Sequence, residues 1–151
     1  MFIGKQMQIT NDYIRGLVDG EGCFTFHTRN KNSLNRKEKV PAFAISMNQR
    51  DKELLEKVRN HLGIKNKVYL HKPYKGDGFN RGYKATLVVR EIGNLKNIIV
   101  PFFYEKLIGY KAEQFQNWLE KIGNDPDIPE TYRLIYRLHK CGYYQKEAKY
   151  Q

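Results

Sequence analysis

The stretch YIRGLVDGEGCF, residues 13–24, changes from a helical to a strand-like pattern within a few residues. Its apolar residues recur at helical spacing and predict a helix over residues 10–20, which two glycines then end. Asp19 and Glu21 lie beside these glycines. The unpaired carbonyl groups of a helix C-terminus favour Lys, Arg or Gly, so two carboxylates at this place require a compensating cation.

Downstream of Gly22 the apolar pattern acquires a period of two, which is typical of half-buried strands. The elements we expect are strands over residues 23–29 and 42–47, a helix from Asp51 to Gly63, and strands over 67–72 and 83–90. The segment TRNKNSLNRKEKVP, residues 28–41, is predicted to be a basic hairpin connection, and PYKGDGFNRG, residues 73–82, a loop.

Helical patterns dominate the rest of the chain. We predict a short segment up to Val100 with a break at Pro101, a helix over 110–122, a last helix after Pro129, and a frayed tail CGYYQKEAKYQ. The fold class is therefore α+β, with an αββαββα core and a four-stranded antiparallel sheet covered by helices on one face. We expect a single domain over residues 1–151, with a core of about 8–123 and a helical extension over 124–151.

The chain has 151 residues and a net charge of +11, from 27 Lys and Arg against 16 Asp and Glu. Such an excess favours a polyanionic partner, because basic groups placed on phosphates release condensed counterions. The only cysteines, Cys23 and Cys141, form neither a disulfide framework nor a zinc-binding pattern. Without a signal peptide or an apolar run long enough to cross a bilayer, we expect a soluble intracellular protein with no membrane partner.

One face of the expected sheet is polar and basic. A twisted, basic ribbon of strands fits a DNA major groove, whereas an ordinary solvated face is the alternative. The candidate DNA contacts on the strands and on the basic connection are Thr25, His27, Arg29, Lys31, Arg36, Lys37, Lys39, Ser46, Tyr69, His71, Lys84, Thr86 and Arg90.

The nine residues IRGLVDGEG, 14–22, resemble the signature of the LAGLIDADG homing endonucleases. Three further segments resemble that family in the same order: FAISMNQRDKELLEKV at 43–58, LGIKNKVY at 62–69 and PFFYEKLIGYKAEQFQNWLE at 101–120. One copy of the motif implies a homodimer. The spacing of Gly16 and Gly20 agrees with this, since a strip without side chains lets two helices approach closely. The expected interface residues are Tyr13, Gly16, Leu17 and Gly20.

The resemblance also implies that the sheet is saddle-shaped. It further implies an activity, namely metal-dependent cleavage of both DNA strands at a long pseudo-palindromic site. Glu21 occupies the position of the metal-binding acid, with the carbonyl oxygen of Gly20 as a second ligand. The implied cofactor is Mg²⁺, with Mn²⁺ as a substitute, while Ca²⁺ is expected to bind without supporting cleavage. A divalent ion at this point offsets the carboxylates brought together by two protomers.

Two further catalytic positions follow from the resemblance. Gln49 fits the family's polar residue at the end of the second strand. Counting from Phe43 without a gap instead places Met47 at that position. Lys111 fits the family's lysine, with Lys106 as the alternative. Asp19 is expected to form a surface ion pair with Arg15, four residues earlier, and Arg15 is expected to face solvent.

Other functions compete with this one. The same fold can serve as a DNA-binding protein that does not cleave, or as a maturase whose partner is the host intron RNA. A basic structural RNA-binding protein is a further alternative. The richness in Lys, Asn, Ile, Tyr and Phe suits the A/T-rich genome of an organelle, mitochondrion or chloroplast, or of a bacterium, without distinguishing among them.

Overall fold

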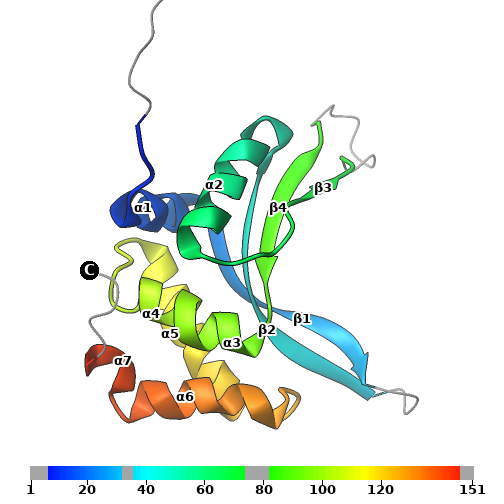
Figure 1. Ribbon diagram of the computed structural model, residues 1–151. Helices are drawn as coiled ribbons and strands as arrows, with labels where there is room; N and C mark the ends of the chain where they lie inside the picture. The colour runs from blue at the N-terminus through cyan, green and yellow to red at the C-terminus, as the bar shows by residue number, and fades with distance from the viewer. Residues whose placement is uncertain (1–6, 32–35, 74–81, 147–151) are drawn as a thin grey trace, which may run out of the picture.

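The computed structural model describes residues 7–31, 36–73 and 82–146 (Figure 1). Its main elements are α1 (Asn11–Glu21), β1 (Gly22–Lys31), β2 (Arg36–Asn48), α2 (Lys52–Leu62), β3 (Tyr69–His71), β4 (Lys84–Val89), α3 (Ile92–Asn94), α4 (Val100–Phe103), α5 (Tyr110–Asn124), α6 (Arg133–Lys140) and α7 (Tyr143–Lys146). Among these residues, no helix is long and apolar enough to cross a bilayer.

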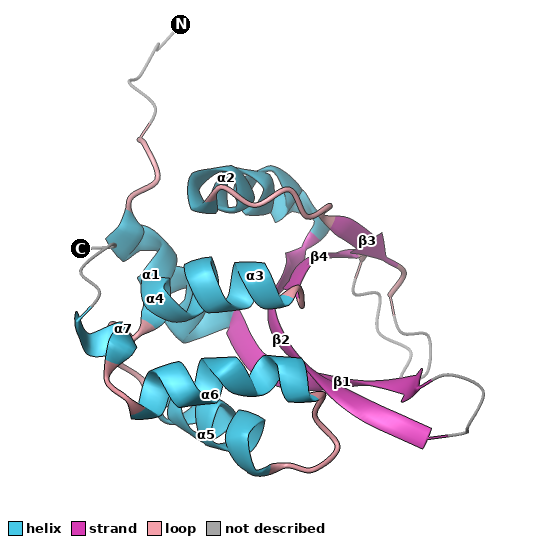
Figure 2. Cartoon of the chain, turned by 60° about the horizontal axis from the view of Figure 1, so that its bottom comes forward, coloured by secondary structure: helices cyan, strands magenta, loops and turns pink. Residues whose placement is uncertain are grey.

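The four strands form one antiparallel sheet in the order β1-β2-β4-β3. The helices lie on one face of this sheet and leave the other open (Figures 1 and 2). Both the predicted fold class and the predicted order of the elements are confirmed.

Helix α1 runs into β1 without a linker. The Thr10 hydroxyl accepts a hydrogen bond from the Tyr13 N–H at 3.1 Å and caps the start of the helix. At the other end, a Cβ added to Gly22 would lie 2.6 Å from the Val18 side chain and 2.9 Å from its carbonyl oxygen. Only glycine therefore fits where the chain turns from helix to strand.

The first two strands are longer than predicted. Residues 28–31 and 36–41, expected to be a connection, extend the ribbon of β1 and β2, while residues 32–35 lie outside the described part of the chain. Strand β4 pairs with β2 only from Asn48 to Phe43, so residues 36–42 have β1 as their only neighbouring strand. Pro41 is tolerated here because its missing N–H interrupts no ladder with β4.

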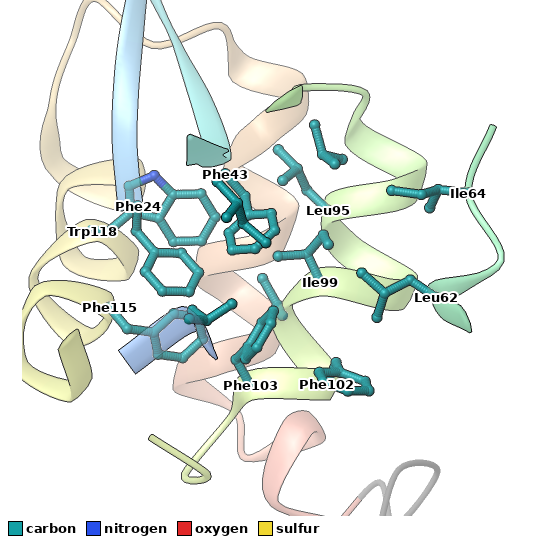
Figure 3. Packing of buried hydrophobic residues seen from close by; sticks show 14 of the residues in the cluster. Phe24, Phe43, Leu62, Ile64, Leu95, Ile99, Phe102, Phe103, Phe115 and Trp118 are labelled. Carbon is teal, nitrogen blue, oxygen red and sulfur yellow. The ribbon is translucent and has the colours of Figure 1, made fainter. Parts of the chain in front are cut away.

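Aromatic side chains fill the core between the sheet and the helices (Figure 3). Phe24 on β1 has its ring centroid 4.8 Å from that of Phe115 on α5 and 5.3 Å from that of Phe43 on β2. Trp118 and Phe103 complete the cluster around it. This packing attaches α4 and α5 to the sheet and so fixes the position of the segment between them.

Two expectations for the C-terminal part are wrong. Pro101 does not break the helix, because a π-helical turn over Leu95–Ile99 precedes it and α4 continues to Phe103. A π turn shifts the backbone hydrogen bonds by one residue and accommodates a proline that has no N–H. The tail is also not frayed up to Lys146: Tyr144 on α7 is only 3% exposed, and its hydroxyl donates to the Lys96 carbonyl oxygen at 3.0 Å.

Candidate functional site

Asp19 joins the end of α1 to the start of α5. Its carboxylate accepts hydrogen bonds from the backbone N–H groups of Ile108, at 3.0 and 3.2 Å, and Gly109, at 3.0 Å. Gly109 is the N-cap residue of α5 and has no side chain to satisfy the first amides of that helix. Asp19 supplies this acceptor from a distant part of the chain, so the expected role in an ion pair with Arg15 is wrong.

Arg15 is buried, with 5% of its surface exposed, and does not face solvent as predicted. Its Nε donates to the Phe102 carbonyl oxygen at 3.0 Å, and its guanidinium lies 4.7 Å from the centre of the Phe102 ring. Asp12 pairs with it at 3.5 Å. Arg15 therefore fixes α1 against the end of α4. The segment between α4 and α5 is thus attached to α1 at both ends, by Arg15 at its start and by Asp19 at its end.

Two further contacts hold α5 against β1. The Phe24 N–H donates to the Gln114 side-chain oxygen at 2.9 Å, and the Trp118 indole N–H donates to the Thr25 carbonyl oxygen at 2.8 Å. Lys111 stands in the first turn of α5, between Gly109 and Gln114, so both neighbouring contacts fix the helix turn that carries it. Lys106 is exposed in the preceding turn.

Glu21 and Gly20 form the exposed C-terminal end of α1. The last turn of this helix holds no basic residue, and no described residue forms a hydrogen bond or ion pair with the Glu21 carboxylate. Within the described residues there is also no group of three or more His, Cys, Asp or Glu side chains that could hold a metal. One chain thus presents a single carboxylate and helix-end carbonyl groups, hard oxygen donors that fit a divalent cation only when other ligands complete the set.

The two candidates at the end of β2 differ in environment. Met47 pairs with Ala85 on β4, and its side chain packs partly against the core. Gln49 is exposed in a 3₁₀ turn, and its backbone N–H donates to the Tyr83 carbonyl oxygen at 2.9 Å. An exposed amide can order water and a half-buried thioether cannot, so the structure favours Gln49 for the predicted role.

The strand register brings most of the predicted DNA contacts to the open face. Thr25 and His27 alternate with the core residue Phe24 on β1, and Tyr69 and His71 pair with Thr86 and Lys84 across β3 and β4. The Ser46 and Thr86 hydroxyl groups are 2.9 Å apart and share a hydrogen bond. Thr86 is only 8% exposed, so it presents little surface to a ligand.

A cavity of about 260 Å³ lies at the end of β4. It is lined by His27, Arg29, Val40, Arg90, Glu91 and Tyr132. Burial, followed by the positive charge of Arg90, lowers the pKa of His27 below its ordinary value of 6.5. His27 is therefore neutral at pH 7 and can either donate or accept a hydrogen bond.

The cations of the ribbon are divided between its two faces. Arg29 forms an ion pair with Glu38, directly opposite it across β1 and β2. Lys39 pairs with Thr28 in the register and lies on the other face, where its ammonium is 3.0 Å from the Asp125 carboxylate. Lys39 therefore faces away from the open face and is not available as a DNA contact there. Lys37 shares the face of Lys39, Arg36 is exposed, and the Lys31 side chain lies outside the described part of the chain.

The outward side of α1 is open. A Cβ added to Gly16 or to Gly20 would meet nothing within 4 Å, so neither glycine is required by packing within the chain. Tyr13 on the same helix is 49% exposed, whereas Leu17 is half-buried against the core. This strip has room for the close approach of a second helix, and the dimer interface itself stays a prediction.

The sequence profile of the LAGLIDADG endonuclease family matches residues 14–122, and the chain therefore belongs to this family. Over 61 residues it is 41% identical to the probable intron-encoded DNA endonuclease 1 of Mycosarcoma maydis. That match covers 40% of this chain but only 21% of the relative's length.

Solved structures of homing endonucleases share the fold. The I-LtrWI LAGLIDADG homing endonuclease bound to target DNA is 28% identical, with a TM-score of 0.59 over 73% of this chain and 35% of that chain. The LAGLIDADG meganuclease I-CpaMI bound to uncleaved DNA is 19% identical, with a TM-score of 0.63 over 99% and 48%. The homing endonuclease I-TnaI is 20% identical, with a TM-score of 0.55 over 89% and 98%.

Proposed function

We propose that this chain acts as a homodimeric, divalent-metal-dependent endonuclease that cleaves both strands of DNA at a long pseudo-palindromic site. The observation that carries this proposal is the exposed Glu21 carboxylate at the end of α1, which has no partner among the described residues and lies next to the start of the open sheet face. Membership of the endonuclease family supports cleavage as the activity.

A second copy of the chain would complete the site. Packing α1 against its two-fold mate along Gly16 and Gly20 brings two Glu21 carboxylates and two helix C-termini to one seam. The relative lengths agree with this arrangement: the fold spans 48% of the I-CpaMI chain but 98% of the I-TnaI chain. Two such folds can therefore be joined in one chain or supplied by two.

Glu21 and the carbonyl oxygen of Gly20 would hold Mg²⁺ or Mn²⁺ together with the DNA phosphate. The bound ion supplies an activated water nucleophile and charge stabilisation for phosphodiester hydrolysis. Gln49 would orient the water, and Lys111 would stabilise negative charge at the scissile phosphate. Each protomer would cut one strand, and Ca²⁺ would support binding without cleavage.

The open face would lie along the major groove. Its polar residues Thr25, His27, Ser46, Tyr69 and His71 supply donors and acceptors for base edges, while Arg29, Lys84 and Arg90 are able to contact bases or phosphates. A two-fold axis between protomers requires two related half-sites in the DNA.

The substitution Glu21→Gln tests the assignment. A preferred duplex is first selected with the parent protein from a randomised DNA pool in Ca²⁺, then placed in a supercoiled plasmid and incubated with Mg²⁺. We expect Glu21→Gln to bind this duplex and to lose cleavage by a factor of at least about 100, because the amide is a poor ligand for the ion. Glu53→Gln, an equal charge change at an exposed position of α2, is the control and should cleave normally.

Each alternative has a distinct result. Cleavage by Glu21→Gln at the rate of the parent would show that the active-site assignment is wrong. Absence of cleavage by the parent in Mg²⁺ and in Mn²⁺, with tight DNA binding retained, would identify a DNA-binding protein. Tighter binding to structured intron RNA than to the selected duplex at the same salt concentration would favour a maturase.

A further inference from the structure

The outer half of the β1 and β2 ribbon extends beyond the rest of the sheet (Figure 1). The pairing of β1 with β2 continues to Lys31 and Arg36, whereas β4 ends at Val89. A two-stranded ribbon alone is marginally stable in water, and the angle at which it projects is not fixed by its own hydrogen bonds. His27 and Arg29, which face the proposed DNA, are on this part.

A stiff turn lies next to the free edge of β2. In the segment DPDIPE, residues 125–130, two prolines restrict the backbone between α5 and α6. The Asp125 carboxylate accepts a hydrogen bond from the Asp127 N–H at 2.9 Å, and the Ile128 side chain is 3% exposed in the core. The turn is thus fixed by its own sequence and by the core, independently of the ribbon.

This turn contacts the ribbon through backbone and side chain. The Lys39 N–H donates to the Asp127 carbonyl oxygen at 3.0 Å, which continues the hydrogen bonding of the sheet past the end of β4. The Lys39 ammonium donates to the second oxygen of Asp125 at 3.0 Å. Both bonds attach to the face and edge of β2 that point away from the proposed DNA.

Tyr132 fills the gap between this turn and the end of β4. Its hydroxyl donates to the Arg90 carbonyl oxygen at 2.7 Å, and its ring is 8% exposed beside Val40 in the wall of the cavity that His27 and Arg29 line. The turn therefore bonds to the free edge of β2, and Tyr132 bonds to the residue that follows β4.

We propose that the Asp125 carboxylate, the backbone carbonyl group of Asp127 and the Tyr132 side chain form a brace that sets the angle of the outer ribbon and so positions His27 and Arg29 for the outer base pairs of the target. These three are positioning residues, and they lie beyond residues 14–122, which the family profile matches. The inference rests on the proposed DNA-binding function. It adds that the helical extension controls recognition without contacting the nucleic acid.

Removing the charge of Asp125 distinguishes the brace from a simple electrostatic effect, because the two predict opposite changes in affinity for the target. Asp125→Asn removes a negative charge from a protein of net charge +11, and electrostatics alone would tighten binding to every DNA. The brace predicts the opposite for the target. We expect affinity for the selected duplex to fall about tenfold, as the loss of one good base contact would cause, while affinity for unrelated DNA stays equal or rises.

The test compares sequence selection from a randomised duplex pool in Ca²⁺ by the full-length parent, Asp125→Asn, Tyr132→Phe and Asp127→Asn. Asp127→Asn is the matched control: it makes the same charge change two residues away, and the bond from Asp127 to Lys39 uses the backbone. We expect Asp125→Asn and Tyr132→Phe to lose preference at the outer positions of the site only. Identical selection by Asp125→Asn and Asp127→Asn would refute the brace.

Amide hydrogen exchange separates failure of the brace from failure of the proposed function. The Lys39 amide should exchange faster in Asp125→Asn than in Asp127→Asn, while the amides of β4 remain protected in both. Equal protection of Lys39 in the two variants refutes the brace whatever the DNA experiment shows. A third outcome combines the two experiments: Lys39 exchanges faster in Asp125→Asn, but the parent protein selects no sequence from the DNA pool. This outcome refutes the proposed function, and it refutes the role of the brace in recognition with it.

Discussion

The substitution Asp19→Ala removes the acceptor that joins α1 to α5. Two backbone N–H groups, those of Ile108 and Gly109, lose a charged partner at 3.0 Å. Each such bond contributes about 1 kcal/mol net where water can replace the partner, as it can here because Ile108 is 92% exposed. The expected loss in unfolding free energy is therefore about 2 kcal/mol.

Helix dipoles change this estimate little. Asp19 lies in the last turn of α1, where a carboxylate is unfavourable, and at the start of α5, where it is favourable. Each effect is worth about 0.3–1 kcal/mol, and the two have opposite signs. The hydrogen bonds therefore decide the result, and a loss of about 2 kcal/mol lowers the melting temperature of a chain this size by roughly 4–8 °C.

Calorimetry or urea unfolding measures this loss, with Asp12→Ala as the control. Asp12 belongs to the same helix and pairs with Arg15 at 3.5 Å, but its side chain is 96% exposed, so its removal should cost below about 0.5 kcal/mol. Because the Asp19 bonds also hold the segment before Lys111, the proposed function predicts slower cleavage by Asp19→Ala. Equal stability of the two variants would refute the account of the α1 and α5 junction.

Gly22→Ala places a Cβ 2.6 Å from the Val18 side chain and 2.9 Å from its carbonyl oxygen. Urea unfolding should show a loss of at least about 2 kcal/mol in unfolding free energy. A loss below about 0.5 kcal/mol would contradict the tight junction. Arg15→Lys cannot keep both the bond to Phe102 and the ring contact, so it should lose about 1–2 kcal/mol in the same assay, and wild-type stability would contradict that geometry. For His27, whose pKa is lowered in the fold, the unfolded chain binds more protons near pH 6. Stability should therefore rise with pH up to the unfolded pKa of 6.5, and His27→Gln should lose this pH dependence. An NMR titration that gives His27 a pKa at or above 6.5 would contradict the burial.

The elements of the fold were predictable where local patterns and tertiary packing agree. The helix after Asp51 ends at Gly63, in the left-handed conformation that its sequence predicts, and the apolar stripe of α5 is buried as expected. The ribbon was predicted too short because its outer residues are polar on both faces. Only pairing between the two strands, and the contact with Asp127, reveals them as strands.

The residue types of the site were predictable from the sequence, but the hydrogen bonds that hold them in place were not. The motif identifies Glu21 as the exposed acid, whereas the partner of Asp19 lies 89 residues away and leaves no periodic signal. The same holds for Gln114 and Trp118, whose bonds to β1 cross 90 and 93 residues. The bond between Asp125 and Lys39 likewise crosses 86 residues and leaves no local signal. The roles of Gln49 and Lys111 stay predictions.

The direct junction of α1 and β1 at Gly22 has a consequence for how such a protein acquires new targets. With no linker to absorb rotation, the acid at the end of the helix and the first residues of the strand move as one rigid body. The far end of the ribbon, by contrast, is steadied from a separate segment. Under the proposed function, changes there would alter which DNA sequence is recognised without shifting the position of cleavage, so recognition and cleavage would evolve on different residues.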